Sequence, residues 1–343
     1  MLIKMIDNEA KKLGIEMIGY TGPLAFYSLE ETLRERIKKN ESPEFEEKDI
    51  MLRIDPKKTM DNCKSIIVVG LSYYKKVTNK SNAKIKGSLS RSSWGIDYHR
   101  VLKDHMESLT RELKKSIDFE FMIFTDTGPL VDREVAHRAG LGYYGKNCSL
   151  INPKFGSYFF IGYILTNLDL NINESPLESE CGDCDLCLRA CPTNALIGAG
   201  KLKANKCISY LTQTKNPINE ELTKKMGIKI YGCDTCQVVC PKNIGIKESS
   251  HDEFIPYKTG GFIDIEELLK MSKKDFNNKY RDMAGSWRGK SVLIRNALIS
   301  LNNIGIDDYY DLVKTIDNKE VELLKPYTKI WLDNYMKRQN LRG

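Results

Sequence analysis

Eight cysteines are concentrated between Cys181 and Cys240 of this 343-residue sequence, which contains ten cysteines in all. The first run, CGDCDLCLRACP at 181–192, has spacings of two, two and three residues followed by proline, and CDTCQVVCP at 233–241 repeats most of that pattern. Thiolates at such spacings bind the irons of [4Fe–4S] clusters, and in two-cluster ferredoxins the fourth cysteine of a run ligates the other cluster. The sequence therefore predicts one-electron transfer through two iron–sulfur clusters.

The second run lacks one cysteine, and Cys207, which lies between the runs, supplies it. We expect one cluster to be bound by Cys181, Cys184, Cys187 and Cys240, and the other by Cys191, Cys207, Cys233 and Cys236. Because the eight thiolates fill both clusters, no iron is left open for catalysis, and both clusters should only carry electrons. Two zinc ions bound by four cysteines each would use the same eight residues and are the alternative. Cys63 lies outside the pattern and is expected to pack as a small apolar residue.

The rest of the sequence has the composition of a globular protein. Hydrophobic residues make up 41% and charged residues 29%, and no stretch approaches the roughly eighteen apolar residues of a membrane helix. The N-terminal segment MLIKMIDNEAKKLGIEMIGY has charged residues where a signal peptide needs an apolar core. We therefore expect a cytoplasmic protein without a membrane partner, in which clustered thiols bind metal rather than form disulfides.

Basic residues are concentrated around and after the cysteines. The formal net charge of the whole chain is +7. Residues 201–247 contain nine lysines and three acidic residues, and residues 270–295 contain eight basic and two acidic residues. A charged stretch is commonly a solvated surface, but the position of these stretches beside the cysteines favours an RNA partner.

Hydrophobic periodicity divides the chain into a mixed part, the cysteine region and a helical part. Helical spacing is found at 4–14, 97–116 and 130–139, and strand signals at 16–20, 63–74, 119–125 and on both sides of a turn at 153–156. A polar loop is expected at 75–93. After about residue 257 the strand signals end, and helices are expected at 264–271, 273–280, 291–303, 307–315 and 319–337. The predicted fold class is α+β.

The first part of the chain carries none of the common nucleotide motifs. No G-x-G-x-x-G segment follows a strand and no P-loop is present, so a Rossmann or ATP site lacks support. The D-x-H-x-x-G signature that provides a histidine ligand to cobalamin in many enzymes is missing as well. The four histidines, His99, His105, His137 and His251, are scattered, and each is expected to be an ordinary surface or core residue. The clusters nevertheless imply a second redox centre or an exchangeable donor in this part.

Four segments of the sequence resemble epoxyqueuosine reductases. They are SRSSWGIDYHRVL (90–102), DTGPLVDREVAHRAGLGYYGKNCSLINPKFGSYFFIG (126–162), KCISYL (206–211) between the two cysteine runs, and GSWRGKSVLIRNAL (285–298). The resemblance runs through most of the chain in the same order. It implies an enzyme that uses cobalamin and two [4Fe–4S] clusters to reduce epoxyqueuosine to queuosine at the wobble position of tRNA. An external low-potential electron donor is implied as well, and we expect the enzyme to be a monomer.

The resemblance also implies three domains. Residues 1–173 would form a mixed α/β cobalamin-binding domain, similar to nitroreductases and to cobalamin-trafficking proteins. Residues 174–256 would form a ferredoxin-like domain with two clusters, and residues 257–343 a helical, HEAT-like region that binds tRNA. This helical region is shorter than in many relatives, which leaves the extent of its contact with tRNA open.

Asp126, the first residue of the DTGP segment, matches the proposed proton donor of the family. Opening an epoxide places negative charge on oxygen, so a nearby proton donor is required. An aspartate in water has a pKa of about 3.9, so this role implies an apolar or anionic pocket that raises it. The strand at 119–125 is the expected source of that pocket. An Asx turn or a cap of the helix at 130–139 is the alternative role for Asp126.

Further residues match cofactor and RNA positions of the family. Those at cobalamin-contacting positions are Arg53, Ser90, Lys146, Asn147, Cys148, Phe155, Gly156 and Ser157, together with Asp126. Those in the tRNA-facing set are Arg288, Lys290 and Arg295. Some relatives have cysteine at the position of Ser90. Cys148 is equally consistent with a small buried side chain, and the three basic residues with an ordinary surface helix.

Two other functions remain open from the sequence alone. A cobalamin carrier or electron-transfer module would use the same clusters without binding RNA, but it leaves the basic stretches unexplained. A corrinoid reductive dehalogenase has similar cluster motifs and a similar mixed domain, yet such enzymes are usually exported, and no signal sequence is recognised here.

Overall fold

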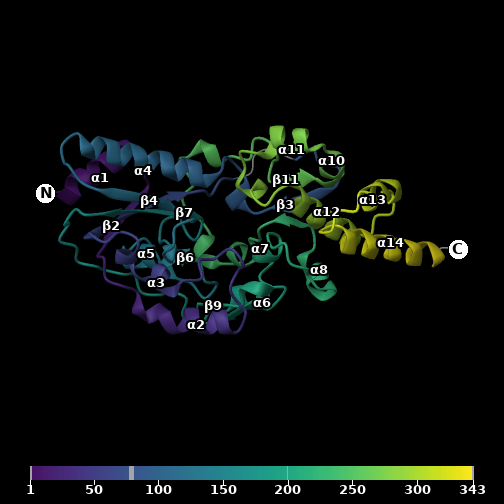
Figure 1. Cartoon of the computed structure of the whole chain (residues 1–343), viewed down its shortest axis with the longest axis horizontal. Coiled ribbons are helices and arrows are strands. Elements are labelled where there is room, and N and C mark those ends of the chain that lie inside the picture. The colour runs from purple at the N-terminus through teal and green to yellow at the C-terminus, as the bar shows by residue number, and fades with distance from the viewer. Residues whose placement is uncertain (1, 77–80, 199, 342–343) are drawn as a thin grey trace.

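The computed structural model describes residues 2–76, 81–198 and 200–341. The molecule is elongated, with a sheet of the N-terminal half at one end and the C-terminal helices at the other (Figure 1). This sheet has four strands in the order β1-β2-β7-β4, and all neighbours are antiparallel. The strands are β1 (Met17–Thr21), β2 (Ser65–Ser72), β7 (Phe159–Thr166) and β4 (Phe121–Thr125). They confirm the strands predicted at 16–20, 63–74 and 119–125.

The two central strands form the apolar middle of the sheet. β2 and β7 pair over eight residues, from Ser65 opposite Thr166 to Ser72 opposite Phe159. Every residue of β2 is buried, because helices cover both faces and the apolar, partly β-branched sequence SIIVVGLS suits a pleated surface covered on both sides. Successive side chains of β2 therefore enter two different cores.

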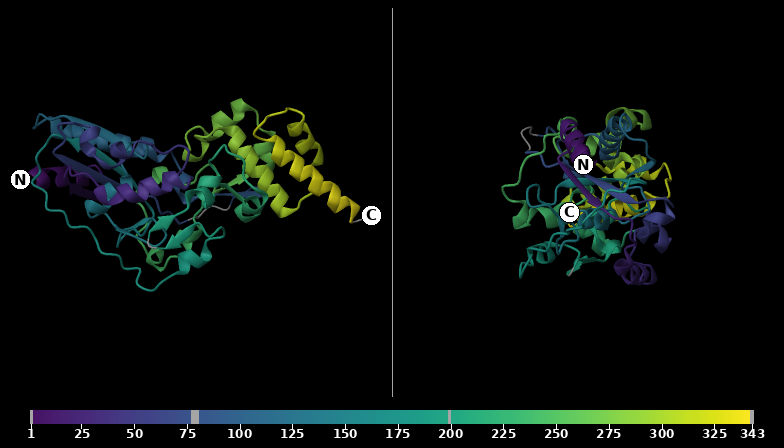
Figure 2. Two further views of the ribbon diagram at one scale, coloured as in Figure 1. Left: turned by 60° about the horizontal axis from the view of Figure 1, so that its bottom comes forward. Right: turned by 90° about the vertical axis from the view of Figure 1, so that its left-hand side faces the viewer.

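Helices cover the two faces of the sheet, as Figures 1 and 2 show. One face carries α1 (Leu2–Lys12) and α4 (Tyr98–Lys114), and the other carries α2 (Glu30–Lys38), α3 (Ile50–Ile54) and α5 (Asp132–Arg138). On the first face Val69 shares a core with Leu102 of α4, and on the second face Val68 shares a core with Val135 of α5. The helices predicted at 4–14, 97–116 and 130–139 are confirmed. Helix α2 was not predicted, because Leu33 is its only buried residue.

A second sheet joins parts of the chain that are far apart in sequence. It consists of β10 (Lys229–Tyr231), β3 (Lys86–Leu89) and β11 (Phe262–Asp264), with β3 in the middle. Gly87 permits the close packing of β3, since a Cβ atom there would lie 2.3 Å from Cγ1 of Ile230. The predictions of a loop through 75–93 and of no strand after residue 257 are wrong at β3 and β11, which are too short to give a period-two pattern. Residues 77–80 of the predicted loop lie outside the described residues.

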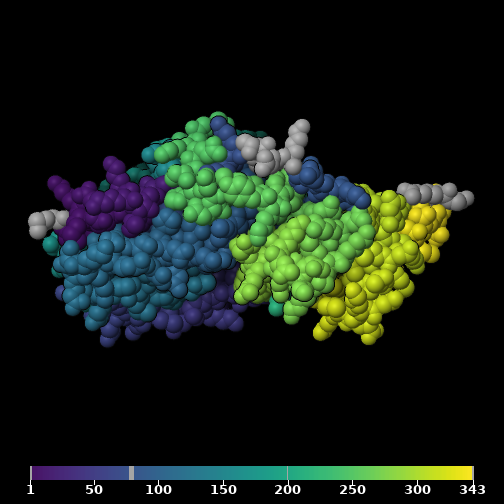
Figure 3. Space-filling view, turned by 90° about the horizontal axis from the view of Figure 1, so that it is seen from above, coloured from purple at the N-terminus to yellow at the C-terminus, as the bar shows by residue number. Residues whose placement is uncertain are grey.

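The second sheet takes one strand from each of the three predicted domains. The core beside it also includes Leu89 and Trp94 from the N-terminal part together with residues of the C-terminal helices. In the space-filling view of Figure 3, residues near 250–280 lie against both the N-terminal layers and the C-terminal helices. The boundaries at 173 and 256 therefore stay predictions, and the packing of the chain crosses them.

The C-terminal core is built around one buried helix. The helices are α10 (Ile265–Lys270), α11 (Lys273–Tyr280), α12 (Lys290–Ile304), α13 (Tyr310–Asp317) and α14 (Lys325–Asn340). In α12 every residue from Val292 to Leu301 is buried, because α14, α10 and β10 pack around it. The first four predicted helices are confirmed, whereas the last begins at Lys325 instead of residue 319; the HEAT-like character stays a prediction. No helix in the described part of the chain has the length and apolar character needed to cross a membrane.

The cysteine segment has little regular structure. Its short helices α6 (Leu186–Ala190) and α9 (Thr235–Val238) pack against each other, and β8 (Leu196–Gly198) and β9 (Lys201–Leu202) form a hairpin beside α6. Helices α7 (Ile208–Leu211) and α8 (Glu220–Met226) lead from this hairpin to β10. The buried apolar residues of the segment's core are Cys148, Cys187 and Leu196. So small a core contributes little apolar burial to stability.

Candidate functional site

The first predicted ligand set is gathered around α6 and the end of the second cysteine run. Cys187 lies in α6, and Cys181 and Cys184 precede it. Burial raises the pKa of Cys240, and the neighbouring thiols of Cys181 and Cys184 raise it further. Burial also raises the pKa of Cys187, to which Cys240 and Cys181 contribute. These four thiols are therefore neighbours, and Cys184 is the exposed one.

The second predicted set surrounds Cys207. Burial raises the pKa of Cys207, and Cys233 and Cys191 add to the rise. Burial raises the pKa of Cys236 as well, with contributions from Cys207 and Cys233. These mutual effects agree with the two groups that the spacing predicts, although Cys187 of the first group also raises the pKa of Cys236. The division of the eight thiols into two ligand sets and their ligation to iron stay predictions.

Cys191 has a lowered pKa, because hydrogen bonds stabilise its thiolate. Burial alone would raise its pKa, but hydrogen bonds from Leu196, Thr193 and Ala195 outweigh burial and lower the pKa below its usual value. One of these is donated by the backbone N–H of Ala195 to Sγ of Cys191 at 3.3 Å. Such bonds orient and stabilise a thiolate ligand. Among the described residues no three histidine, cysteine or acidic side chains are placed to hold a single metal ion, whereas the thiolates of a cubane each bind a different iron.

The segment 143–148 borders both groups of thiols. Nζ of Lys146 donates a hydrogen bond of 2.6 Å to the carbonyl of Gly182, beside Cys181. Cys148 has a left-handed backbone (φ 65°) and shares its small core with Cys187. Burial raises the pKa of Cys148 to about 11, so this thiol stays protonated at neutral pH. Lys146 and Cys148, predicted as cobalamin contacts, have these contacts with the cysteine segment.

Asp126 lies on the turn that connects β4 to α5. Its backbone is left-handed (φ 54°), and 63% of its side chain is exposed. The strand before it therefore does not enclose its carboxyl, and the expectation of an apolar pocket formed by residues 119–125 is wrong. The cap position of α5 is occupied by Val131 without a side-chain hydrogen bond, so Asp126 does not cap that helix either.

The carboxyl of Asp126 is held by two residues from the start of α4. The hydroxyl of Tyr98 donates a hydrogen bond to Oδ2 of Asp126, and Nε2 of His99 lies 3.8 Å from the same oxygen. On its other side His99 meets Asp97, with 2.7 Å between Nδ1 and Oδ1. Burial lowers the pKa of His99, but the hydrogen bond and charge of Asp97 and the charge of Asp126 raise it above its usual value. This arrangement favours a protonated imidazole next to Asp126.

A partly buried carboxyl near this turn belongs to Asp132. Its Oδ2 accepts a hydrogen bond of 3.0 Å from the backbone N–H of Asp126. Burial, followed by the charge of Asp126, raises the pKa of Asp132 to about 8. Asp132, Tyr98 and His99 were not predicted as site residues. The signal available was their place in the quoted family segments, because periodicity does not distinguish these residues from ordinary polar positions.

The remaining residues predicted to contact cobalamin lie in separate places. Arg53, at the end of α3, pairs with Glu46 at 2.7 Å and is 12% exposed, and its carbonyl accepts a hydrogen bond from Val131. Phe155 is buried in the core that includes α5. Gly156 and Ser157 lie against the second cysteine run, where the backbone N–H of Ser157 donates to Oδ1 of Asn243 at 2.8 Å. A Cβ atom on Gly156 would lie 2.1 Å from that Oδ1.

Ser90 connects β3 to the second cysteine run. Its hydroxyl donates a hydrogen bond to Oδ1 of Asp234, and the backbone N–H of Arg91 donates to Oδ2 of the same carboxylate at 2.8 Å. Asp234 follows Cys233 directly, so Ser90 lies next to the second group of thiols. Oγ1 of Thr125 and Nδ2 of Asn147 are among the ten buried side-chain polar atoms that have no hydrogen-bond partner in the part of the chain that the structure describes.

Of the three residues predicted to face tRNA, Arg295 does not do so, and its prediction is wrong. Its side chain is wholly buried and donates hydrogen bonds to the carbonyls of Thr214 and Leu211 and to Oδ1 of Asn296. An inward-facing position of α12 hides it from any RNA. Arg288 is 14% exposed and pairs with Glu44, and Nζ of Lys290 bonds to the carbonyl of Met271.

A basic groove lies between α11, the start of α12 and the start of α14. It has a volume of about 1110 Å³, and its charged lining residues are Lys215, Lys273, Arg281, Arg288, Lys290 and Glu322. Trp287 also lines it and is 51% exposed, with the guanidinium of Arg288 4.8 Å from its ring centre. Nε1 of Trp287 donates to the hydroxyl of Tyr231 at 3.1 Å, and the charge of Asp126 is among those that act on that hydroxyl. Tyr231 thus contacts a residue of the groove and also feels the charge of Asp126.

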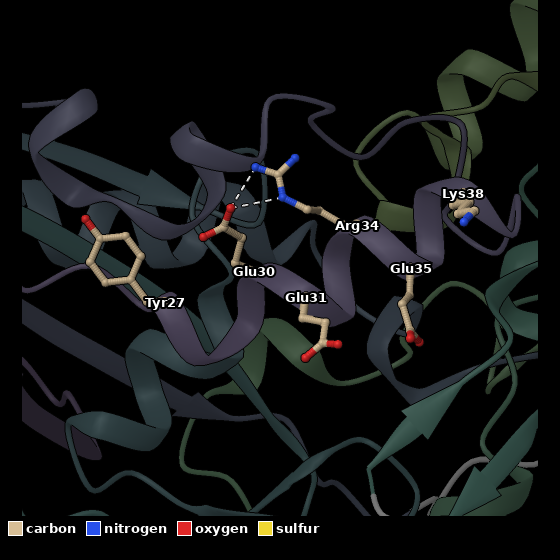
Figure 4. Close-up of a pocket in the computed structure, with 6 residues that line it drawn as sticks. All are labelled: Tyr27, Glu30, Glu31, Arg34, Glu35 and Lys38. Atoms are coloured by element: carbon tan, nitrogen blue, oxygen red, sulfur yellow. Dashed lines mark hydrogen bonds and ion pairs between the residues drawn. The ribbon is translucent and has the colours of Figure 1, made fainter.

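A separate shallow pocket of about 420 Å³ lies on α2 and contains none of the predicted site residues. In Figure 4 its labelled side chains come from Tyr27 and from one side of α2, and Glu30 and Arg34 bond to each other. The other charged side chains of this pocket lie along the exposed helix without converging on a common point.

Two family models match the chain. The model described as epoxyqueuosine reductase QueG, DUF1730, matches residues 53–127, which include the Asp126 turn. The model described as a 4Fe-4S double cluster binding domain matches residues 180–243, which include the eight cysteines of the two groups. This match favours iron–sulfur clusters over zinc, and the chain carries a 4Fe-4S double cluster binding domain.

Curated relatives and solved structures match over nearly the whole chain. An epoxyqueuosine reductase of Bacillus anthracis is 43% identical over 296 residues, which cover 85% of this chain and 78% of the relative. The structure of epoxyqueuosine reductase from Streptococcus thermophilus has a TM-score of 0.90 and 37% identity, and covers 98% of this chain and 91% of that one. A crystal structure of epoxyqueuosine reductase with an epoxyqueuosine-modified tRNA-Tyr stem loop has a TM-score of 0.87 and 33% identity, with 98% and 99% covered. The chain belongs to the epoxyqueuosine reductase family.

Proposed function

We propose that this chain reduces epoxyqueuosine to queuosine at the wobble position of tRNA. Its family supports the reaction, and the relative solved with an epoxyqueuosine-modified stem loop supports tRNA as the substrate. Removal of the epoxide oxygen consumes two electrons and two protons, releases water and leaves a carbon–carbon double bond. The observation that carries the proposal is the accessible carboxyl of Asp126, held between Tyr98 and His99.

The cysteine segment would hold the two [4Fe–4S] clusters. We assign Cys181, Cys184, Cys187 and Cys240 to one, and Cys191, Cys207, Cys233 and Cys236 to the other. The mutual effects of these thiols on their pKa values support this division. The exposure of Cys184 makes the first set the more accessible to an external low-potential electron donor.

The residues present also fit cobalamin, which is rich in amide groups. Asn147 and Thr125 each offer a buried polar atom without a partner among the described residues, and Gly156 belongs to the proposed contact set as well. Arg53, Ser90, Lys146, Cys148, Phe155 and Ser157 complete the proposed contact set. When bound, cobalamin would supply a cobalt centre capable of one-electron chemistry for reduction of the epoxide.

Asp126 would deliver the proton that the epoxide oxygen needs as its bond to carbon breaks. Its exposure leaves it open to a substrate, and the left-handed turn is fixed by the bond from its N–H to Asp132. His99 lies 3.8 Å away and has a raised pKa, so it is suited to return a proton to Asp126 after each turnover. The hydroxyl of Tyr98 holds the carboxyl in place between these events.

The basic groove would bind the phosphate backbone beside the wobble base. Lys215, Lys273 and Arg281 are exposed in it, and Trp287 offers a ring for stacking. If several phosphates are neutralised, the logarithm of the affinity falls with the logarithm of the salt concentration by ~0.7 to 0.9 per phosphate. A salt-independent affinity for tRNA would remove the groove from this role.

The decisive experiment supplies the reconstituted, cobalamin-loaded chain with a reductant and tRNA containing epoxyqueuosine, and analyses the released nucleosides by mass. We expect queuosine to appear with the wild type and to be nearly absent with Asp126→Asn. A chain that takes up both cofactors but forms no queuosine would instead be a cobalamin carrier or electron-transfer module.

A further inference from the structure

Tyr143 presents a buried hydroxyl that the fold of the protein leaves unused. The residue is 1% exposed and lies in β5 (Tyr143–Tyr144), which pairs with β6 (Leu150–Ile151) so that Tyr143 is opposite Ile151. Within the described ranges its hydroxyl has no hydrogen-bond partner. A buried hydroxyl without a partner is unfavourable, and a phenylalanine would fill the same space without that cost. The hydroxyl therefore points to a partner that is not part of the chain.

The surroundings of Tyr143 indicate where that partner lies. Two hydrogen bonds hold the segment before α6 against β5: Oγ of Ser179 donates to the carbonyl of Tyr144 at 3.1 Å, and Nζ of Lys146 donates to the carbonyl of Gly182 at 2.6 Å. Cys181 lies between Ser179 and Gly182. The charges of Glu180, Cys181 and Cys240 act on the Tyr143 hydroxyl, which agrees with the place that these two hydrogen bonds give the hairpin beside the first group of thiols.

Sulfur atoms of an iron–sulfur cluster accept hydrogen bonds from nearby donors. A bond of this kind stabilises the additional negative charge of the reduced cluster and so raises its reduction potential. A hydroxyl held in a hairpin is a suitable donor, because burial keeps water from competing for it and a phenol, with a pKa of about 10, keeps its proton at neutral pH.

We propose that the hydroxyl of Tyr143 donates a hydrogen bond to a sulfur of the cluster held by Cys181, Cys184, Cys187 and Cys240. The bond makes this cluster easier to reduce than it would otherwise be and leaves the other cluster unaffected. Tyr143 is thus a residue that sets the potential of the accessible cluster. The inference rests on the proposed assignment of the cysteines to two clusters.

The test compares reduction potentials in the full chain, reconstituted with iron and sulfide without oxygen and without tRNA. Tyr143→Phe removes one oxygen and keeps the ring. Titration followed by electron paramagnetic resonance should show one cluster potential shifted to a more negative value and the other unchanged. The matched control is Tyr144→Phe, since the Tyr144 hydroxyl already bonds to Oε2 of Glu134 at 3.1 Å; both potentials should stay at their wild-type values in it.

A second measurement uses the wild type alone. In the reduced cluster, electron–nuclear double resonance should detect an exchangeable proton that disappears in D₂O and is missing in Tyr143→Phe. Unchanged potentials, an equal shift of both potentials, or the absence of such a proton in the wild type would overturn the inference while leaving the proposed function intact. A wild type that binds far fewer than about eight irons would overturn the cysteine assignment itself.

Discussion

The N-terminal sheet and the cysteine segment obtain their stability in different ways. In the sheet, all residues of β2 are buried between two helical layers, and cores on both faces contain long apolar side chains. The cysteine segment buries Cys148, Cys187 and Leu196 in its own core and brings eight thiols together instead. The first region is stabilised by apolar burial, and we expect the second to obtain most of its stability from bound iron.

Removal of iron should produce the largest difference in stability between the two regions. After chelation, residues 180–203 and 233–243 should lose protection from hydrogen exchange, whereas β2 and β7 should keep theirs, because the sheet's cores do not include the clusters. Hydrogen exchange followed by mass spectrometry on holo and iron-free protein measures both regions in one experiment. Equal loss of protection in the sheet would show that its stability also depends on iron.

Asp126→Asn should leave both regions intact and still abolish most activity. The exposed side chain contributes little to packing, whereas loss of a proton donor costs about 10²- to 10⁴-fold in turnover. Iron content and melting temperature serve as the controls. Turnover within a few-fold of the wild type would exclude Asp126 as the proton donor.

Leu102→Ala tests the sheet region by itself. Leu102 is wholly buried between α4 and the sheet, so its truncation should cost about 2–5 kcal/mol of unfolding free energy. The iron content of the folded variant should stay at the wild-type value. The matched change in the cysteine segment, Leu196→Ala, should cost less in the presence of iron, since the site is at the edge of a small core; a larger loss there would reverse the comparison.

The smallest effect expected concerns pH. Asp132 has a folded-state pKa of about 8, well above that of an unfolded aspartate, so the native state retains a proton that the unfolded state releases from about pH 4 upward. Its contribution to stability is therefore fully present below pH 4 and is lost as the pH rises to 8. In Asp132→Asn the decline of melting temperature over this interval should be shallower than in the wild type. An identical decline would mean that Asp132 is ionised in the folded protein.

The sequence predicted the regions that carry strong local patterns. The apolar run of β2 and the helical stripe of α4 indicate buried elements by themselves, and the cysteine spacing indicates the two groups of thiols before any tertiary contact is known. The short strands β3 and β11 could not be found in this way, because they exist only through pairing with each other in a sheet whose strands come from distant parts of the chain.

The candidate site was predictable only in its outline. The resemblance pointed to Asp126, but the partners of its carboxyl come from α4, and the carboxyl with the raised pKa is that of Asp132. Arg295 was also misplaced by the sequence. It was expected at the surface because it is basic, but it donates hydrogen bonds to buried carbonyl groups. Charge alone does not tell which face of a helix a residue occupies.

The sheet β10-β3-β11 has a practical consequence for anyone who divides this enzyme into fragments. A cut near residue 173 or 256 would strip one strand from a three-stranded ribbon and leave its neighbours with open edges. The cysteine segment is therefore not expected to fold as an isolated fragment. A shorter functional variant would have to keep all three strands or replace the missing strand with a designed one.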